Sequence, residues 1–291
     1  MKGAYRDVCK PRQPQVPIMA RCWYLGWLLA LGLAACDSSD RYIQLLHSAD
    51  PEVQRSASFK LLLRGKGAAP RLLQALQEEP EEVRYIIVQL LGKIGDSRAT
   101  EPLLAILRDE VEPAMREEAA ESLGKLGDQR AVATLVLAAG DDPNPGVRAE
   151  ALKALLNLRY ENMGELLLAA VVDPAPAVRK AALLGLTRLG PAEWTVELAA
   201  LALDSDPGVS YLAVQLLGRQ GGELAVVTLV EALGSDNGSV REEAATALGK
   251  LKAASAKEAL IDLMTRSNGP DGEAARRALR TIFGVDFQVV E

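Results

Sequence analysis

An internal repeat of about 31 residues constrains this sequence more than any other feature. An apolar residue, followed by arginine in most repeats, recurs at intervals of 30 to 32 residues, as Val53, Val83, Met115, Val147, Val178, Val209 and Val240. The eighth residue after each of these is leucine in all seven repeats, and the fourth is alanine in six of them. Offsets of zero, four and eight residues fall on one face of an α-helix. The pattern therefore predicts seven helices that pack through the same face.

Each predicted helix has signals that begin and end it, and a second apolar helix follows. Acidic residues before proline, such as Asp142-Pro143, precede the first helix of a repeat, and glycines such as Gly95 and Gly127 follow it. An acidic cap accepts bonds from free N–H groups, proline is tolerated in the first turn, and glycine ends a helix at low cost. One hairpin of this size cannot bury its apolar stripe alone, so neighbouring hairpins must stack.

The stack is expected to be an all-α, right-handed α-solenoid of about seven helical hairpins over residues 41–284. A lone helix at residues 40–47 and an eighth first helix at residues 273–284 would cap its ends, and residues 285–291 form a predicted C-terminal capping tail. The fourth repeat departs from the pattern, because Leu156 and Arg159 stand where other repeats have glycine.

The repeat resembles a known family. The run D-P-x-V-R-x-x-A-x-x-x-L-G-x-L-G is clearest in Asp109–Gly127, Asp206–Gly221 and Ser235–Leu251. It is similar to the short HEAT repeat of the bilin-lyase type, and the resemblance covers about five-sixths of the chain. That resemblance implies the architecture but little about function, since such repeats occur in lyases, hydroxylases, adaptors and scaffolds alike.

The N-terminal residues are expected to address the chain to a membrane. Residues 22–35 are an uncharged apolar run after Arg21, too short to span a bilayer but suited to a signal peptide. The run ends in Leu33-Ala34-Ala35-Cys36, which resembles the lipobox of bacterial lipoproteins. We expect residues 1–35 to be a signal peptide, with a possible true start at Met19, and residues 36–40 to be a lipidated terminus and short tether on Cys36. The expected location is the bacterial cell envelope, on the periplasmic or extracytoplasmic face.

The charge balance argues against nucleic acid as a partner. The full chain carries a formal charge of −6, and residues 36–291 carry 28 basic and 38 acidic side chains, or −10. Phosphate backbones require clusters of lysine and arginine, so an acidic surface of this kind repels them.

The residues offer no recognisable catalytic centre. His47 is the only histidine in the chain. The paired His-Glu motifs that bind iron in HEAT-repeat hydroxylases are missing, and neither a zinc site nor a nucleophile with a positioned base can be assembled. The sequence therefore predicts no metal, no cofactor and no enzymatic activity.

The arginine after the apolar anchor is expected to be structural. It recurs as Arg84, Arg116, Arg148, Arg179 and Arg241, with Gln54 and Ser210 as exceptions. We expect a ladder in which each arginine bridges successive repeats through carboxylates and turn carbonyls. The alternative is a stripe that binds anions.

Other residues are candidates for contact with a partner. In HEAT solenoids the second helices line the concave surface, and projecting the repeat onto them exposes Arg98, Glu101, Arg130, Glu165, Glu193, Glu231, Glu258 and Asp262. Trp194 occupies a second-helix column that is otherwise small, so it is either a binding anchor or part of the core. Tyr85, Tyr160 and Tyr211 are expected to be partly exposed.

Three functions remain open from the sequence. The first is a lipid-anchored envelope scaffold or adaptor that binds a protein or peptide on its curved surface. The second is an enzyme or chromophore-handling protein related to bilin lyases, and the third is a purely architectural spacer.

Overall fold

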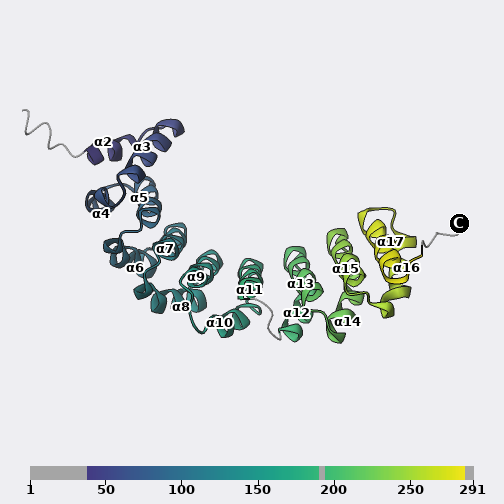
Figure 1. Cartoon of the computed structure of the whole chain (residues 1–291). Coiled ribbons are helices and arrows are strands. Elements are labelled where there is room, and N and C mark those ends of the chain that lie inside the picture. Colours follow the sequence, from purple (N-terminus) through teal and green to yellow (C-terminus); the bar gives the residue numbers. More distant parts are fainter. Residues whose placement is uncertain (1–37, 190–193, 286–291) are drawn as a thin grey trace, which may run out of the picture. The chain divides into compact units, whose positions relative to one another are not determined.

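The computed structural model describes residues 38–189 and 194–285, and these residues form sixteen α-helices, four short 3-10 turns and no strand. The predicted all-α repeat fold is therefore confirmed (Figure 1). By its internal contacts the chain divides into two compact units, residues 1–63 and residues 64–291.

The first unit contains α2 (Ser38–Leu45) and most of α3 (Pro51–Arg64). The Nε2 of Gln54 donates a hydrogen bond to the Leu46 carbonyl at 2.9 Å, and the Lys60 ammonium lies 5.7 Å from the centre of the Tyr42 ring. The helix predicted at residues 40–47 thus begins two residues earlier and ends at Leu45. Residues 38–40, which the sequence assigned to a tether, are its first turn.

The second unit is a stack of helical hairpins. Its first helices are α5 (Glu81–Ile94), α7 (Pro113–Leu126), α9 (Pro145–Asn157), α11 (Pro176–Leu189), α13 (Pro207–Gln220), α15 (Gly238–Lys250) and α17 (Pro270–Phe283). Its second helices are α4 (Ala69–Glu78), α6 (Thr100–Asp109), α8 (Val132–Asp141), α10 (Met163–Ala170), α12 (Thr195–Ala202), α14 (Glu223–Ala232) and α16 (Lys257–Arg266). The last first helix therefore begins three residues before its predicted start.

The ends of the helices follow the expected chemistry, with one departure. Asn144, Asp206 and Asn237 cap first helices, and their side-chain oxygens accept bonds from backbone N–H groups of the first turn. Gly127 ends α7 with a φ of 77°. In the fourth repeat Arg159 takes the left-handed conformation, with a φ of 55°, although this conformation costs a residue with a side chain more than it costs glycine.

The leucine column predicted from the sequence forms the centre of the core. Leu61, Leu91, Leu123, Leu155, Leu186, Leu217 and Leu248 are all at most 2% exposed. Each fills the space between a first helix and its neighbours, so the repeat in sequence is a repeat in packing.

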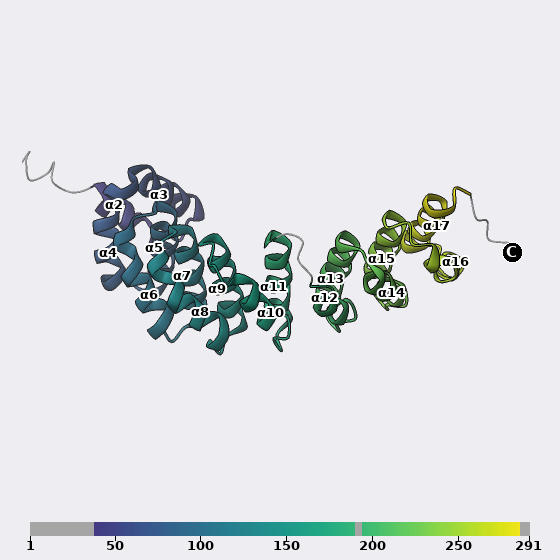
Figure 2. The same ribbon diagram turned by 60° about the horizontal axis from the view of Figure 1, so that its bottom comes forward.

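The first helices form the tighter of the two layers in this unit. A Cβ added at Gly124 of α7 would lie 2.7 Å from the Cα of Ala154 in α9, and one added at Gly218 of α13 would lie 2.6 Å from the Cβ of Ala247 in α15. Successive second helices contact one another much less (Figure 2). When one layer of a stack is closer-packed than the other, the stack bends toward the closer layer. The first helices therefore line the inner side of each bend, and the expectation that second helices line it is wrong.

None of the helices in the described residues combines the length and the apolar character that crossing a bilayer requires.

Candidate partner-binding surfaces

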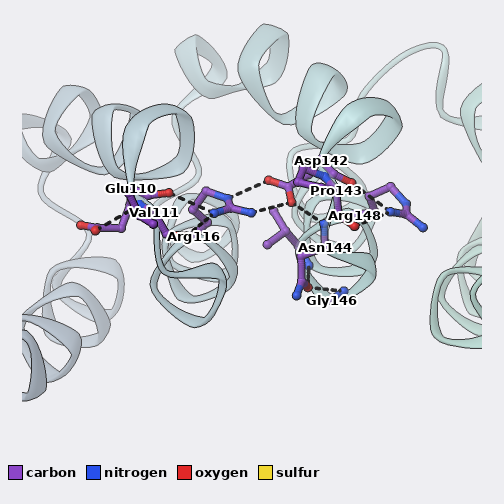
Figure 3. Close-up of polar contacts among 9 residues, drawn as sticks. Glu110, Val111, Arg116, Asp142, Pro143, Asn144, Gly146 and Arg148 are labelled. Atoms are coloured by element: carbon purple, nitrogen blue, oxygen red, sulfur yellow. Dashed lines mark hydrogen bonds and ion pairs between the residues drawn. The ribbon is translucent and has the colours of Figure 1, made fainter.

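The arginine after each anchor joins two repeats. The Nε and Nη2 atoms of Arg116 each donate to Asp142 at 2.9 Å, and its Nη1 donates to the carbonyl oxygens of Glu110 and Val111 at 3.0 Å (Figure 3). The side chains of this pair are only 10% and 8% exposed. Arg116 therefore holds the turn before its own helix and the turn of the next repeat with one side chain.

The same arrangement recurs along the stack. The pairs are Arg84–Glu110 at 2.6 Å, Arg148–Asp173 at 2.8 Å, Arg179–Asp204 at 2.7 Å and Arg241–Asp271 at 2.7 Å. We call these four pairs together with Arg116–Asp142 the arginine ladder. Burial raises the pKa of Asp142, but hydrogen bonds from Arg116 and from the Asn144 N–H outweigh it, so the pKa is lowered. Each ladder arginine is paired with a carboxylate, and all but Arg84 also donate to turn carbonyls. These bonds leave the ladder arginines little capacity to bind a further anion.

One joint of the ladder is uncharged. Ser210 stands where the other repeats have arginine, and its hydroxyl donates to the Ala202 carbonyl at 2.6 Å. Ser235 stands where the preceding repeat has Asp204, and it accepts a bond from the Asn237 N–H as Asp204 does from Asp206. Both charges of the pair are missing together, so neither is left buried without a partner.

Arg98 and Arg130, which the sequence offered as partner-binding residues, have structural bonds of their own. The Nη2 of Arg130 donates to the Ser97 carbonyl at 2.9 Å and to Asp128 at 2.6 Å. Arg98 makes the matching bonds to the Lys66 carbonyl and to Asp96. Each arginine thus joins the turn of its own repeat to the turn before it. Their side chains remain about half exposed.

The other second-helix candidates are exposed and scattered. Glu101 lies 3.8 Å from Arg130, and Asp262 forms an ion pair with Arg266 at 3.0 Å. Glu165, Glu231 and Glu258 are exposed on three different helices, and Glu193 lies outside the described residues. These residues form no common pocket in the part of the chain that the structure describes.

Trp194 caps the start of α12 and is partly buried. Its ring edge would lie 3.4 Å from a Cβ at Gly164, and it lines a cavity of about 250 Å³ with Leu186, Leu198 and Leu216. Its indole Nε1 is buried and has no acceptor among the described residues. The tryptophan therefore fills space between α10 and α11–α13 and only partly reaches solvent.

The inner row of first helices carries carboxylates that the pattern did not single out. Glu118 of α7 is 4% exposed. Its Oε2 accepts from the Gln89 amide at 2.9 Å, while its Oε1 is buried with no donor in residues 38–189 and 194–285. Burial, the hydrogen bond to Glu118 and the charge of Glu118 raise the pKa of Tyr85 to about 12. Burial and the charge of Glu150 raise the pKa of Glu117 beside it. This site favours a cation.

The pairing of tyrosine with two glutamates occurs again four repeats later. Tyr211 of α13 donates to Glu243 of α15 at 3.4 Å, and the charge of Glu243 raises the pKa of Tyr211. A groove of about 500 Å³ runs over these residues, and Glu242 and Thr246 also line it. Between the two tyrosines, a second groove of about 490 Å³ crosses α7, α9 and α11. We call these features together the first-helix face.

Part of this face could be recognised in the sequence. Tyr85 and Tyr211 were expected to be partly exposed, and the adjacent pairs Glu117-Glu118 and Glu242-Glu243 are visible in the sequence. Each tyrosine contacts a glutamate about one repeat later in the sequence. These contacts depend on the close spacing of successive first helices. Within the described residues, no group of three histidine, cysteine, aspartate or glutamate side chains has an arrangement that could hold a metal ion.

Two features predicted at the N-terminus lie outside the described residues. They are the predicted signal peptide, residues 1–35, and the predicted lipidation site at Cys36. The predicted tail at residues 285–291 also lies outside them, except for Val285.

Solved structures resemble this chain in fold. The Escherichia coli protein YibA is 17% identical, with a TM-score of 0.63, and the match covers 94% of this chain and 99% of that one. Human deoxyhypusine hydroxylase is 24% identical with a TM-score of 0.39, over 85% of this chain and 96% of that one. The phycocyanin lyase complex of CpcE and CpcF from Nostoc is 23% identical with a TM-score of 0.47, over 51% of this chain and 98% of that one. No curated protein sequence matches.

The prediction that the chain has no enzymatic activity is corrected by these matches. The solved structures that match include a hydroxylase and a lyase. The lack of a catalytic motif in the sequence therefore does not separate a binding protein from an enzyme. At such low identity the likeness is one of fold, and it assigns neither activity to this chain.

A family model supplies the classification. The model of HEAT repeats matches residues 39–112, 69–156, 164–239 and 196–280, which together span most of the described residues. These matches cover both units and the same hairpins that the sequence repeat defines. The chain belongs to the family of HEAT-repeat proteins.

Proposed function

We propose that this protein binds a basic segment of a partner protein along its first-helix face. The observation that carries the proposal is the pair of matching sites at Tyr85 with Glu117 and Glu118, and at Tyr211 with Glu242 and Glu243. No ion pair found within the described residues involves any of these four glutamates. Lysine or arginine side chains of a partner would supply the missing charge.

The chemistry of the face supports a cationic ligand in two ways. A buried carboxylate oxygen without a donor is costly, and a cation that reaches it would relieve that cost. A tyrosine ring beside carboxylates also attracts lysine or arginine through its π-face. The net charge of −6 adds long-range attraction for a basic partner.

We further propose that a lipid on Cys36 holds the protein to a membrane of the bacterial envelope, as a scaffold or adaptor. This part rests on the lipobox-like run Leu33-Ala34-Ala35-Cys36 alone. Stable anchoring would require more than one acyl chain.

Photocrosslinking in cells tests the binding face. A photoreactive phenylalanine at Tyr211 is expected to capture a partner, and the same residue at Val227, which is 51% exposed on α14, serves as the control on the other layer. Replacing Glu242 and Glu243 together by lysine is expected to reduce the adduct at Tyr211 at least about tenfold, because like charges then face the partner. Equal adducts at both positions, or an adduct that survives the charge reversal, would contradict the proposal.

A further inference from the structure

The fourth repeat carries a pocket whose lining is basic and apolar and includes no carboxylate. It lies where α9 and α11 end, before α10 begins, and has a volume of about 350 Å³. Its lining is Leu156, Arg159, Tyr160, Met163, Arg188 and Leu189. Two guanidinium groups and a phenol thus meet three apolar side chains in one small concavity.

The two arginines are free to take an anion. None of the ion pairs or hydrogen bonds in residues 38–189 and 194–285 involves the Arg159 guanidinium, and that of Arg188 donates to the neutral Asn157 amide oxygen at 3.2 Å. The ladder arginines, in contrast, are each paired with a carboxylate. In a chain of net charge −6, two guanidinium groups without a carboxylate at one pocket attract a negatively charged group.

The backbone shows that Arg159 is placed there at a cost. Its φ is 55°, and the chain turns through bonds from the N–H groups of Arg159 and Tyr160 to the Leu156 and Leu155 carbonyls. The equivalent position in the third repeat is Gly127, with a φ of 77°. A left-handed arginine thus places a side chain at a position that glycine fills in the third repeat.

Lys252 provides an internal comparison. It has a φ of 52° and makes the same turn, with bonds from its own N–H and that of Ala253 to the Gly249 and Leu248 carbonyls. It lines neither this pocket nor the two grooves of the first-helix face. The two positions therefore share their backbone and differ in what surrounds the side chain.

The pocket opens onto the first-helix face. Leu156 and Arg188 line both the pocket and the groove of about 490 Å³, where Glu121 and Glu150 lie paired with Lys125 and Lys153. An extended peptide could thus place an anionic end in the pocket while its preceding residues run along the groove toward the carboxylates beside Tyr85 or Tyr211.

We propose that the pocket binds the C-terminal carboxylate of the partner peptide, with an apolar last side chain against Leu156, Met163 and Leu189. Arg159 and Arg188 would hold the carboxylate through charge-assisted bonds, and the Tyr160 hydroxyl would donate a further one. This inference rests on the proposed function, and it adds that the basic segment is the end of a chain with a hydrophobic final residue.

Fluorescence anisotropy with the full chain tests the pocket. The probe is a fluorescein-labelled peptide, Gly-Lys-Lys-Ser-Leu, with a free C-terminal carboxylate, and its twin has a C-terminal amide. We expect the acid to bind at least about tenfold more tightly, since an anion gains bonds that a neutral amide does not. Arg159→Gly and Arg188→Gln are each expected to remove this difference, while Lys252→Gly keeps it. The thermal midpoint of Arg159→Gly, followed by circular dichroism, is expected to be at or above that of the unchanged protein.

Several results would overturn the assignment. These are equal binding of acid and amide, no saturable binding of the acid at millimolar concentration, or an acid preference that persists in Arg159→Gly. Displacement of the acid peptide by inorganic phosphate at a concentration below the dissociation constant of the peptide would assign the pocket to phosphate instead. If the acid preference is absent but the photocrosslink at Tyr211 remains, the carboxylate assignment fails and the proposed function stands. If the acid preference is present but the photocrosslink at Tyr211 is absent, the carboxylate assignment stands and the proposed binding face fails.

Discussion

Arg116 shows how one side chain can join two repeats. Its guanidinium satisfies two turn carbonyls on one side and a carboxylate in the next repeat on the other, while it is almost fully buried. Removing one partner of such a pair is more costly than removing both, because the remaining charge stays buried without compensation. The uncharged joint at Ser210 and Ser235 is a natural example of the second case.

A serine exchange at the Arg116 joint tests this idea. Arg116→Ser is expected to lower the free energy of unfolding by about 3 kcal/mol, because it leaves Asp142 unpaired. The double change Arg116→Ser with Asp142→Ser is expected to recover more than half of that loss. Urea unfolding followed by circular dichroism gives both values. If the double variant is no more stable than the single one, this expectation is wrong. The ion pair would then add stability beyond offsetting the cost of burying its two charges.

Single positions also show what the sequence could and could not reveal. The arginine column could be read as a ladder, because one residue type recurs beside acids at a fixed spacing. The grooves on the first-helix face could not be predicted from the sequence. Tyr85 and Glu118 lie on two different helices, and the repeat does not specify the distance between those helices. The pocket at Arg159 was visible only as a missing glycine.

At the scale of the helices, small residues decide which layer is inside. The hydrophobic period is the same in first and second helices. It therefore predicts two layers but not which layer has the more closely packed helices. The glycine–alanine contacts between first helices, such as Gly124 with Ala154, allow these backbones to approach. The sequence therefore specified the hairpins well and the direction of their bend poorly.

Two glycine substitutions distinguish close approach from open surface. Gly124→Ala is expected to lower the free energy of unfolding by about 1–3 kcal/mol, since the added methyl would overlap Ala154 in the next helix. Gly140→Ala, in α8, meets no atom within 4 Å and is expected to raise stability by about 0.5–1 kcal/mol through helix propensity. Thermal unfolding of the two variants measures the contrast. A stabilising Gly124→Ala would contradict the close packing of α7 and α9.

At the scale of the whole molecule, the carboxylates of the ladder make the free energy of unfolding depend on pH. The pKa values of Glu110, Asp142, Asp173 and Asp271 are lowered in the folded state, and that of Asp96 falls to about 2, mainly through its hydrogen bond with Arg98. A lowered folded pKa adds stability that is complete above the unfolded value, 3.8 for aspartate, and is lost as the pH falls toward the folded value. Glu117 acts in the opposite sense, because its pKa is raised.

The free energy of unfolding is therefore expected to change little between pH 7 and pH 5 and to fall steeply below about pH 4. Urea titrations at a series of pH values measure this dependence. The variant with serine at both positions 116 and 142 is expected to lose less stability over the acid range, because one titrating joint is gone. A free energy of unfolding that stays constant down to pH 3 would contradict the ladder as a source of stability.

Attachment to a membrane is a separate property of the whole chain. Cys36→Ser is expected to move the protein from the membrane pellet to the soluble fraction of cells, because no thiol remains to carry a lipid. Fractionation after a high-salt wash measures this. Retention of the variant in the pellet would show that another segment or partner holds the protein there.

The serine joint between α13 and α15 has a consequence for how the array comes apart. Protonation leaves its two hydroxyl groups unchanged, while it weakens the charged joint that Arg241 and Asp271 form beyond it. Unfolding at low pH should thus be uneven along the array. We expect α13 and α15 to stay folded together after the neighbouring helices have unfolded. Backbone amides of these two helices should then be among the last to exchange with heavy water.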